Sequence, residues 1–353
     1  MMRRRITLGL CLLVLAQPAM AQEPKQDCAP SDLEALAGWG GVWAAESIDA
    51  AHQGLSGRDS NSQALLLGLS APWTDLGRAR MLEMTRRISA GTIEQATWGF
   101  PMMMNSYAEF TIVIAPVATV IINQTREVRT IYTDGRGHLP EDVRWPTNWG
   151  DSVGCWEDET LVVETVSARY DPLLHPFAPP LSDNAHFIER LRMVEPGKLE
   201  NVITITDPAM LTEPWTVEVH YVDAGIDRVV QDAFVDRNDT VNATIIDAPP
   251  GFDPAPLPPP AALSDAELDR LAGRYQVEGA PLVMLVERDG NRLLVSSPPV
   301  DPGRMAMYPD TPLCFTTLFG NAMEFTLDAD GAVTGLTGTA PGGAPFVAAR
   351  LDD

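Results

Sequence analysis

The sequence predicts a mainly β protein: an antiparallel barrel or sandwich with helices at its N-terminal end, followed by a smaller β domain. Three observations lead to this prediction. Short segments of alternating apolar and polar residues recur from residue 109 onward, Asp-Gly pairs separate several of them, and one proline-rich stretch divides the chain. Short, evenly spaced strands joined by tight turns are typical of barrels and sandwiches, whereas parallel βαβ units alternate strands with long helices.

The first residues have the pattern of an export signal. Arginines at positions 3–5 precede an apolar run, residues 6–16, that is too short to span a bilayer. Ala19-Met20-Ala21 provides the small residues that signal peptidase recognises, so we expect cleavage after Ala21 and a periplasmic or secreted protein. The short run fits a membrane anchor less well than a cleaved signal. Lipid attachment at Cys11 is also a weaker interpretation than a cleaved signal, because the residue before this cysteine, Leu10, is large.

The helical and strand patterns follow in a clear order. Ser31 before acidic residues is typical of a helix start, and a second helical region runs from about 61 to 90. Strands are predicted over residues 109–114, 119–123, 127–133, 152–156, 160–165, 186–194, 199–206 and 215–222, with one more over 229–235. In the small domain a helix over 264–268 precedes strands over 281–287, 292–297, 314–319, 322–328 and 332–337.

A proline-rich stretch separates the two domains. Residues 248–262 contain seven prolines among fifteen residues, a composition that favours an extended, semi-rigid linker. We therefore expect a large domain over residues 28–247 and a small domain over residues 263–353.

The charge of the chain excludes some partners. The sequence has 25 Lys and Arg residues against 48 Asp and Glu residues, and removing residues 1–21 with their three arginines leaves 22 against 48, a formal charge of −26. This charge repels nucleic acid and anionic lipids, so we expect no nucleic-acid partner and no membrane insertion after signal cleavage. The oligomeric state is not predicted.

Cysteines and motifs limit the cofactor chemistry. An oxidising compartment permits one disulfide among the three cysteines of the mature chain, and Cys28 could pair with either Cys155 or Cys314. The chain has no nucleotide-binding or metalloprotease motif, and no Cys/His spacing typical of zinc. Without such motifs we expect no cofactor, and because His52, His175 and His220 are isolated in sequence, we expect no metal site.

The small domain contains Leu268-Asp-Arg-Leu-Ala-Gly-Arg-Tyr275, Asp289-Gly-Asn-Arg-Leu293 and Phe325-Thr-Leu-Asp-Ala-Asp-Gly-Ala-Val-Thr-Gly335. In these segments it resembles the lipocalin-like C-terminal domain of some periplasmic serine hydrolases of the penicillin-recognising type. The resemblance implies a lipocalin-like β fold for the small domain. It does not imply hydrolase activity, because the chain has no Ser-x-x-Lys motif.

The large domain contains Arg129-Thr-Ile-Tyr-Thr-Asp-Gly-Arg136, Gly150-Asp-Ser-Val-Gly-Cys-Trp-Glu-Asp-Glu-Thr-Leu-Val-Val-Glu-Thr165 and His186-Phe-Ile-Glu-Arg190. In these segments it resembles a group of uncharacterised secreted bacterial β-rich proteins. The resemblance covers roughly residues 98–220 and implies no activity.

The first group of candidate catalytic residues lies in and next to the loop after residue 133. Asp134, Arg136 and His138 lie at a strand end and in this loop, and binding groups commonly collect in such loops. Tyr132 and Asp151, on either side of the loop, are candidate ligand-binding residues. Alternatively, Asp134 forms a turn and Arg136 is its surface partner, because Asp-Gly turns are common.

Two more candidate catalytic residues lie on the strand over 186–192. Alternation places His186 and Arg190 on one face and Glu189, between apolar residues, on the other. If the first face is inside the barrel, Arg190 could hold an oxyanion and His186 could transfer a proton. If it is outside, Glu189 is buried and needs a partner, and an Arg–Glu bridge in the barrel is the structural alternative. By the same alternation Glu164 lies beside apolar residues.

The remaining candidate ligand-binding residues are aromatic or apolar. Trp98, Phe100 and Met103 belong to Trp98-Gly-Phe-Pro-Met-Met-Met104, which forms either an adaptable lid over a hydrophobic ligand or a plug at one end of the barrel. Trp156 shares one face of its predicted strand with the small residues Ser152 and Gly154, a pattern that either leaves a pocket walled by the indole or packs a tight core.

Three functions follow from these residues. The first is an exported protein that binds a small hydrophobic or aromatic acid-like molecule in a β-barrel cavity. The second is a cofactor-independent lyase, isomerase or cyclase in the same cavity, with His186 or Asp134 as the base and Arg190 or Arg136 as the oxyanion stabiliser. The third is a non-catalytic envelope accessory protein. Expected buried charge favours the first two.

Overall fold

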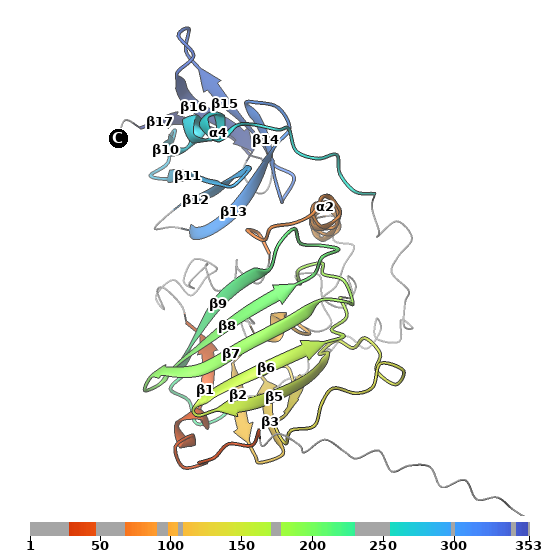
Figure 1. The fold of residues 1–353 in the computed structure, drawn as a ribbon. Coiled ribbons are helices and arrows are strands. Elements are labelled where there is room, and N and C mark those ends of the chain that lie inside the picture. The colour runs from red at the N-terminus through yellow and green to blue at the C-terminus, as the bar shows by residue number, and fades with distance from the viewer. Residues whose placement is uncertain are drawn as a thin grey trace, which may run out of the picture.

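A computed structural model of the chain describes residues 28–46, 68–89, 98–104, 109–170, 178–229, 255–297, 301–339 and 344–351. It confirms the predicted mainly β fold class, with two closed β-barrels, the first of nine strands and the second of eight (Figure 1). The expected signal peptide and cleavage site lie outside the described residues, as does nearly all of the strand predicted over 229–235. No helix in the described ranges is long and apolar enough to cross a membrane.

The first barrel has its strands in sequence order, and β9 pairs back with β1 to close it. The strands are β1 (Val42–Ala45), β2 (Phe110–Ile114), β3 (Ala118–Asn123), β4 (Val128–Tyr132), β5 (Asp151–Glu157), β6 (Thr160–Val166), β7 (His186–Glu195), β8 (Lys198–Thr206) and β9 (Trp215–Asp223). The predicted strands correspond to β2 through β9 with ends that differ by one residue. The sequence does not predict β1, because four residues are too few to show alternation.

One connection departs from the expected hairpins. β4 and β5 pair in parallel through Ile131 and Tyr132, whereas the other neighbouring strands of this barrel are antiparallel. A parallel pair cannot be joined by a tight turn and needs a long connection. Residues 133–150, here called the crossover loop, provide it. The predicted turn at Asp134-Gly135 is present, with Gly135 at a φ of 72°, but it begins this loop instead of a hairpin.

Aromatic and aliphatic side chains fill the interior of the first barrel. Three edge-to-face pairs have ring centroids 4.8–5.0 Å apart: Trp39–Trp156, Phe110–Tyr221 and Phe100–Phe187. Rings of this size bury a large apolar area, and the edge-to-face arrangement adds a favourable electrostatic contribution. The interior is therefore a packed core where these strands and segments meet.

The N-terminal segment is fastened covalently to β5 of this barrel. Cys28 forms a disulfide with Cys155 on β5, and Cys314 is a partly buried free thiol. The helix predicted at Ser31 is wrong, because turns and a short 3₁₀ helix, η1 (Ala37–Trp39), occupy this segment. The carboxylate of Asp32 accepts hydrogen bonds from two following backbone amides at 2.8 and 3.2 Å, which stabilises a turn at the point where a helix would begin.

The second predicted helical region is only partly helical. Helix α2 (Asp75–Ser89) forms, but residues 68–74 are turns with one isolated bridge, and residues 61–67 and 90 lie outside the described part. Pro72 explains the difference, because the residue before a proline is disfavoured in helical conformation. A short 3₁₀ helix, η4 (Met102–Met104), follows later in the chain.

The second barrel also closes in sequence order. It follows α4 (Asp265–Leu271), whose N-cap Ser264 and Glu267 form a capping box. Its strands are β10 (Gly273–Val277), β11 (Val283–Asp289), β12 (Arg292–Ser297), β13 (Asp301–Pro309), β14 (Cys314–Thr317), β15 (Ala322–Leu327), β16 (Val333–Thr339) and β17 (Pro345–Arg350). The sequence predicts five of these strands, all except β10, β13 and β17.

Residues 68–89 lie between the two barrels, where Figure 1 shows α2. On one side Thr74 N donates to Met210 O at 2.8 Å. On the other, the guanidinium of Arg292 on β12 donates to the carbonyls of Ser70 and Ala71 at 2.7 and 2.6 Å. The apolar core of the first barrel also continues into side chains of the second, namely Leu294, Ala306, Tyr308 and Leu318. This junction holds the barrels against a shared segment.

Candidate functional site

The structure places the His186–Arg190 face of β7 outside the barrel. Glu189 points inward and is 2% exposed, whereas Arg190 is exposed and forms an ion pair of 3.0 Å with Glu157 on β5. Both members of that pair are more than half exposed, so it is a solvated surface contact. Of the two arrangements left open by the sequence, the second is the one observed: Glu189 is the buried charge.

The partner of Glu189 is Arg129 on β4. Both oxygens of Glu189 accept from the Arg129 guanidinium, which is 1% exposed and also donates to Thr165 at 2.9 Å. Asn201 donates to Glu189 at 3.0 Å, and the ring of Phe100 stacks on the guanidinium with its centroid 4.0 Å away. Further hydrogen bonds from Asn201 and to Thr165 thus supplement the ion pair, which is what makes the burial of two charges tolerable.

Three candidate ligand-binding residues belong to the same core. Phe100 and Met103 are buried in the interior, and Trp156 is 7% exposed. The phenol of Tyr221 donates to the carbonyl of Met104, and burial raises the pKa of this phenol, which therefore remains neutral. Trp98 is partly buried, and its backbone N donates to Glu127 at 2.8 Å. Residues 98–104 are therefore packed as part of the barrel core.

The structure brings three of the predicted site residues together on the outer face. His138 Nδ1 lies 3.0 Å from Asp151 Oδ2, and His186 Nε2 lies 2.6 Å from Glu164 Oε1. The other oxygen of Glu164 lies 3.8 Å from His138 Nε2, so the four side chains form a continuous series. We call His138, Asp151, Glu164 and His186 the outer-face cluster.

Local geometry explains why these four side chains meet. Asp151 begins β5 and Glu164 lies on β6 with its side chain outward, while His186 begins β7. His138 comes from the crossover loop, and this loop is held by Leu139 N, which donates to the same Asp151 oxygen at 2.9 Å. The parallel pairing of β4 and β5 thus requires a long loop, and that loop delivers an imidazole to the barrel surface.

Electrostatics fixes the state of the central carboxylate. The hydrogen bond from His186 is the main reason that the pKa of Glu164 is lowered, and His138 adds to the effect. Glu164 therefore remains ionised at neutral pH. Because a carboxylate accepts hydrogen bonds and does not donate them, the cluster offers an acceptor between two imidazoles.

The crossover loop that carries His138 also exposes apolar side chains. Leu139, Val143 and Trp145 of the crossover loop, here called the apolar loop patch, are 52%, 49% and 69% exposed. On the sheet, Glu164 pairs directly with Val153 and Ile188 of the neighbouring strands, and both are partly buried. An oriented polar group with apolar neighbours is the usual composition of a ligand site.

The other predicted residues of this region pair with one another. The guanidinium of Arg136 contacts Asp134 at 2.7 and 2.8 Å and stacks on the ring of Tyr132 at 4.1 Å. This arrangement matches the alternative in which Asp134 forms a turn with Arg136 as its partner. It leaves no predicted arginine in contact with the outer-face cluster among the contacts of the described residues.

Glu164 and Arg129 are not among the site residues that the sequence predicts. Alternation nevertheless gives a signal for Glu164, because it places this acid beside the apolar Val162 on one strand. Arg129 likewise shares a face of its alternating strand with the apolar Ile131. Comparison with known proteins adds nothing here: no protein-family model matches the chain, and no curated protein is significantly similar to it.

Proposed function

We propose that this chain is an exported protein that binds a small molecule at the surface formed by the outer-face cluster and the apolar loop patch. The observation that carries the proposal is the series from Asp151 through His138 and Glu164 to His186, together with the exposed apolar side chains of the same loop that carries His138. Export is supported by the Cys28–Cys155 disulfide, since such bonds persist in oxidising compartments.

The geometry favours a ligand with a hydrogen-bond donor. The sequence suggests an acid-like ligand because Arg136 and Arg190 could bind a carboxylate. Each of these guanidinium groups is instead paired with a carboxylate of the chain, Asp134 and Glu157. Glu164 is ionised and lies between the imidazoles, so the complementary ligand group is a hydroxyl or an amine. The proposed ligand is therefore a small aromatic or aliphatic compound that carries one of these groups.

Two variants on the same outer face test this proposal. Glu164→Gln removes the central charge, whereas Glu157→Gln removes a carboxylate of the exposed pair with Arg190 and is the matched control. Compounds carried by the purified protein are extracted and identified by mass spectrometry. In parallel, saturation-transfer NMR compares binding of phenols, aromatic amines and benzoic acids to the wild-type protein and both variants.

We expect phenols or amines to bind the wild-type protein and Glu157→Gln, and to bind Glu164→Gln at least tenfold more weakly. Trp145→Ala should weaken binding as well, because the indole supplies apolar contact area. Binding of acids alone, or binding that Glu164→Gln leaves unchanged, would contradict the assignment of this site. The absence of any bound compound in both experiments would contradict a binding function there.

One contact also favours a second function, cofactor-free proton transfer. Asp151 accepts from His138 Nδ1 and from Leu139 N, which orients the imidazole with Nε2 toward Glu164 Oε2, 3.8 Å away. If the compound identified above is turned over, the pH profile of its kcat should change in His138→Gln. An unchanged profile would show that His138 is not the base.

A further inference from the structure

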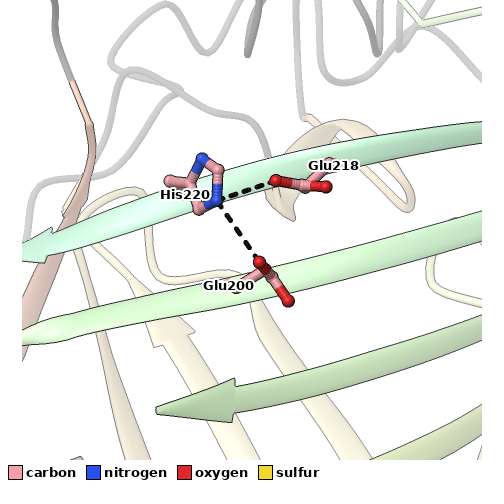
Figure 2. A group of neighbouring side chains, drawn as sticks. All are labelled: Glu200, Glu218 and His220. Carbon is pink, nitrogen blue, oxygen red and sulfur yellow. Dashed lines mark ion pairs between the residues drawn. The ribbon is translucent and has the colours of Figure 1, made fainter. Parts of the chain in front are cut away.

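A second group of titratable side chains lies on other strands of the first barrel. Glu200 on β8 and Glu218 and His220 on β9 each direct one ligand atom toward a common point, and these atoms lie within 4.8 Å of one another (Figure 2). The strand register explains the arrangement. Glu200 pairs directly with His220, and Glu218 precedes His220 by two residues, so all three side chains project from the outer face.

The distances suit a metal ion with one nitrogen and two oxygen ligands. His220 Nε2 lies 3.0 Å from Glu218 Oε1 and 3.6 Å from Glu200 Oε2. Ligands bound at about 2.0–2.2 Å in a tetrahedral site are separated from each other by about 3.3–3.6 Å. Small side-chain rotations would therefore place one ion in contact with all three atoms.

The other nitrogen of the imidazole already faces a carboxylate. Glu46, directly after β1, has Oε2 at 3.7 Å from His220 Nδ1, and its other oxygen accepts from Lys198 Nζ at 2.8 Å. A carboxylate behind a histidine is the common outer contact of metal-bound imidazoles, because it fixes the ring and strengthens the ligand nitrogen. His220 therefore presents Nε2 toward the two glutamates.

Glu200 is held in a similar way. Arg192 on β7 contacts Glu200 Oε1 at 2.7 Å, so Oε2 is the oxygen that faces His220. Glu200 is 13% exposed and His220 24% exposed, which limits their freedom to rotate away. The three carboxylates and two cationic side chains of this group leave one net negative charge, which favours a divalent cation.

We propose that Glu200, Glu218 and His220 bind a divalent transition-metal ion such as Zn²⁺, with Glu46 and Arg192 as supporting residues. The imidazole ligand distinguishes such ions from Ca²⁺ and Mg²⁺, which prefer oxygen ligands. Three protein ligands leave one position of a tetrahedral ion open to water. The sequence predicts no metal here, because the ligands come from two different strands and no other His or Cys lies close to His220 in the sequence.

The test uses purified, tag-free, full-length protein that has been treated with a chelator. Co²⁺ is titrated into it and followed by visible absorption, and Zn²⁺ is then added as a competitor. We expect one Co²⁺ per chain, with the intense bands of a four-coordinate ion, and displacement by Zn²⁺ but not by Ca²⁺. Isothermal titration with Zn²⁺ measures the affinity.

Variants distinguish this site from other acidic surface groups. His220→Ala should abolish the Co²⁺ spectrum, and Glu46→Gln should weaken Zn²⁺ binding roughly 10- to 100-fold, as loss of an outer contact does. Glu213→Gln, an exposed carboxylate elsewhere on this barrel, and His186→Ala, from the outer-face cluster, should leave the affinity unchanged. Circular dichroism melts confirm that each variant is folded.

Three results would overturn the proposal. They are the absence of a Co²⁺ spectrum, a spectrum that survives in His220→Ala, and Ca²⁺ competition equal to that of Zn²⁺. A spectrum lost in His186→Ala would place the ion at the outer-face cluster and would equally reject this assignment.

Discussion

The Arg129–Glu189 pair places two opposite charges inside an apolar barrel, where each depends on the other. Removing one partner leaves the other charge buried and unpaired, so Glu189→Gln should lower the free energy of unfolding by about 3–5 kcal/mol. Urea denaturation measures this loss. Glu157→Gln, which breaks only the exposed pair with Arg190, should cost roughly 0–1 kcal/mol. Equal losses in the free energy of unfolding for the two substitutions would show that the buried pair stabilises the fold no more than the exposed pair does.

The lowered pKa of Glu164 makes the outer-face cluster sensitive to acid. A carboxyl whose pKa is lower in the folded than in the unfolded protein stabilises the fold above its unfolded pKa, near 4.5, and loses this effect as the pH falls. The melting temperature of Glu164→Gln should therefore lie below that of the wild type at pH 7 and approach it between about pH 5 and pH 3. A constant difference across this range would contradict the assigned interaction.

Among the elements, the crossover loop depends on a few contacts at its ends. Asp151 accepts from both His138 Nδ1 and Leu139 N, so Asp151→Asn should loosen the loop without unfolding the barrel. Hydrogen exchange measured by mass spectrometry should become faster in residues 139–145 and stay unchanged in β6 through β9. Asp134→Asn is the control, because Asp134 pairs with the exposed Arg136. Exchange equal to the wild type would mean that other contacts hold the loop.

The sequence predicts those elements whose signal is local. Strands such as β6 alternate over seven residues and are recognised directly, as is the short helix that begins after Ser264. β1 is too short to alternate, and the parallel pairing of β4 with β5 depends on which distant segments become neighbours. For the same reason the sequence suggests His138, Asp151 and His186 separately, while their meeting through Glu164 becomes visible only in three dimensions.

At the scale of the whole molecule, the two barrels are joined by more than a linker. The described part of the proline-rich stretch makes backbone hydrogen bonds to both sides, from Leu257 N to Asp75 O and from Ala261 N to Pro309 O. Arg292 adds the buried contacts with residues 70 and 71.

Cleavage within residues 248–262 should therefore give two fragments that elute together in size-exclusion chromatography. Arg292→Ala should separate them, because the two carbonyls lose their donor. Fragments that separate in the wild-type protein would contradict a shared junction.

The closure of the first barrel has a consequence for its biosynthesis. β1 is the first of the described strands to emerge from the ribosome, yet it pairs with β2, which begins at Phe110, and with β9, which ends at Asp223. Pairings between such distant segments are slow to form, because a long stretch of chain must be ordered first. Until β9 has been made, β1 and the growing sheet both present open strand edges, which are prone to aggregate. The first barrel can therefore close only after the chain has been made as far as the end of β9.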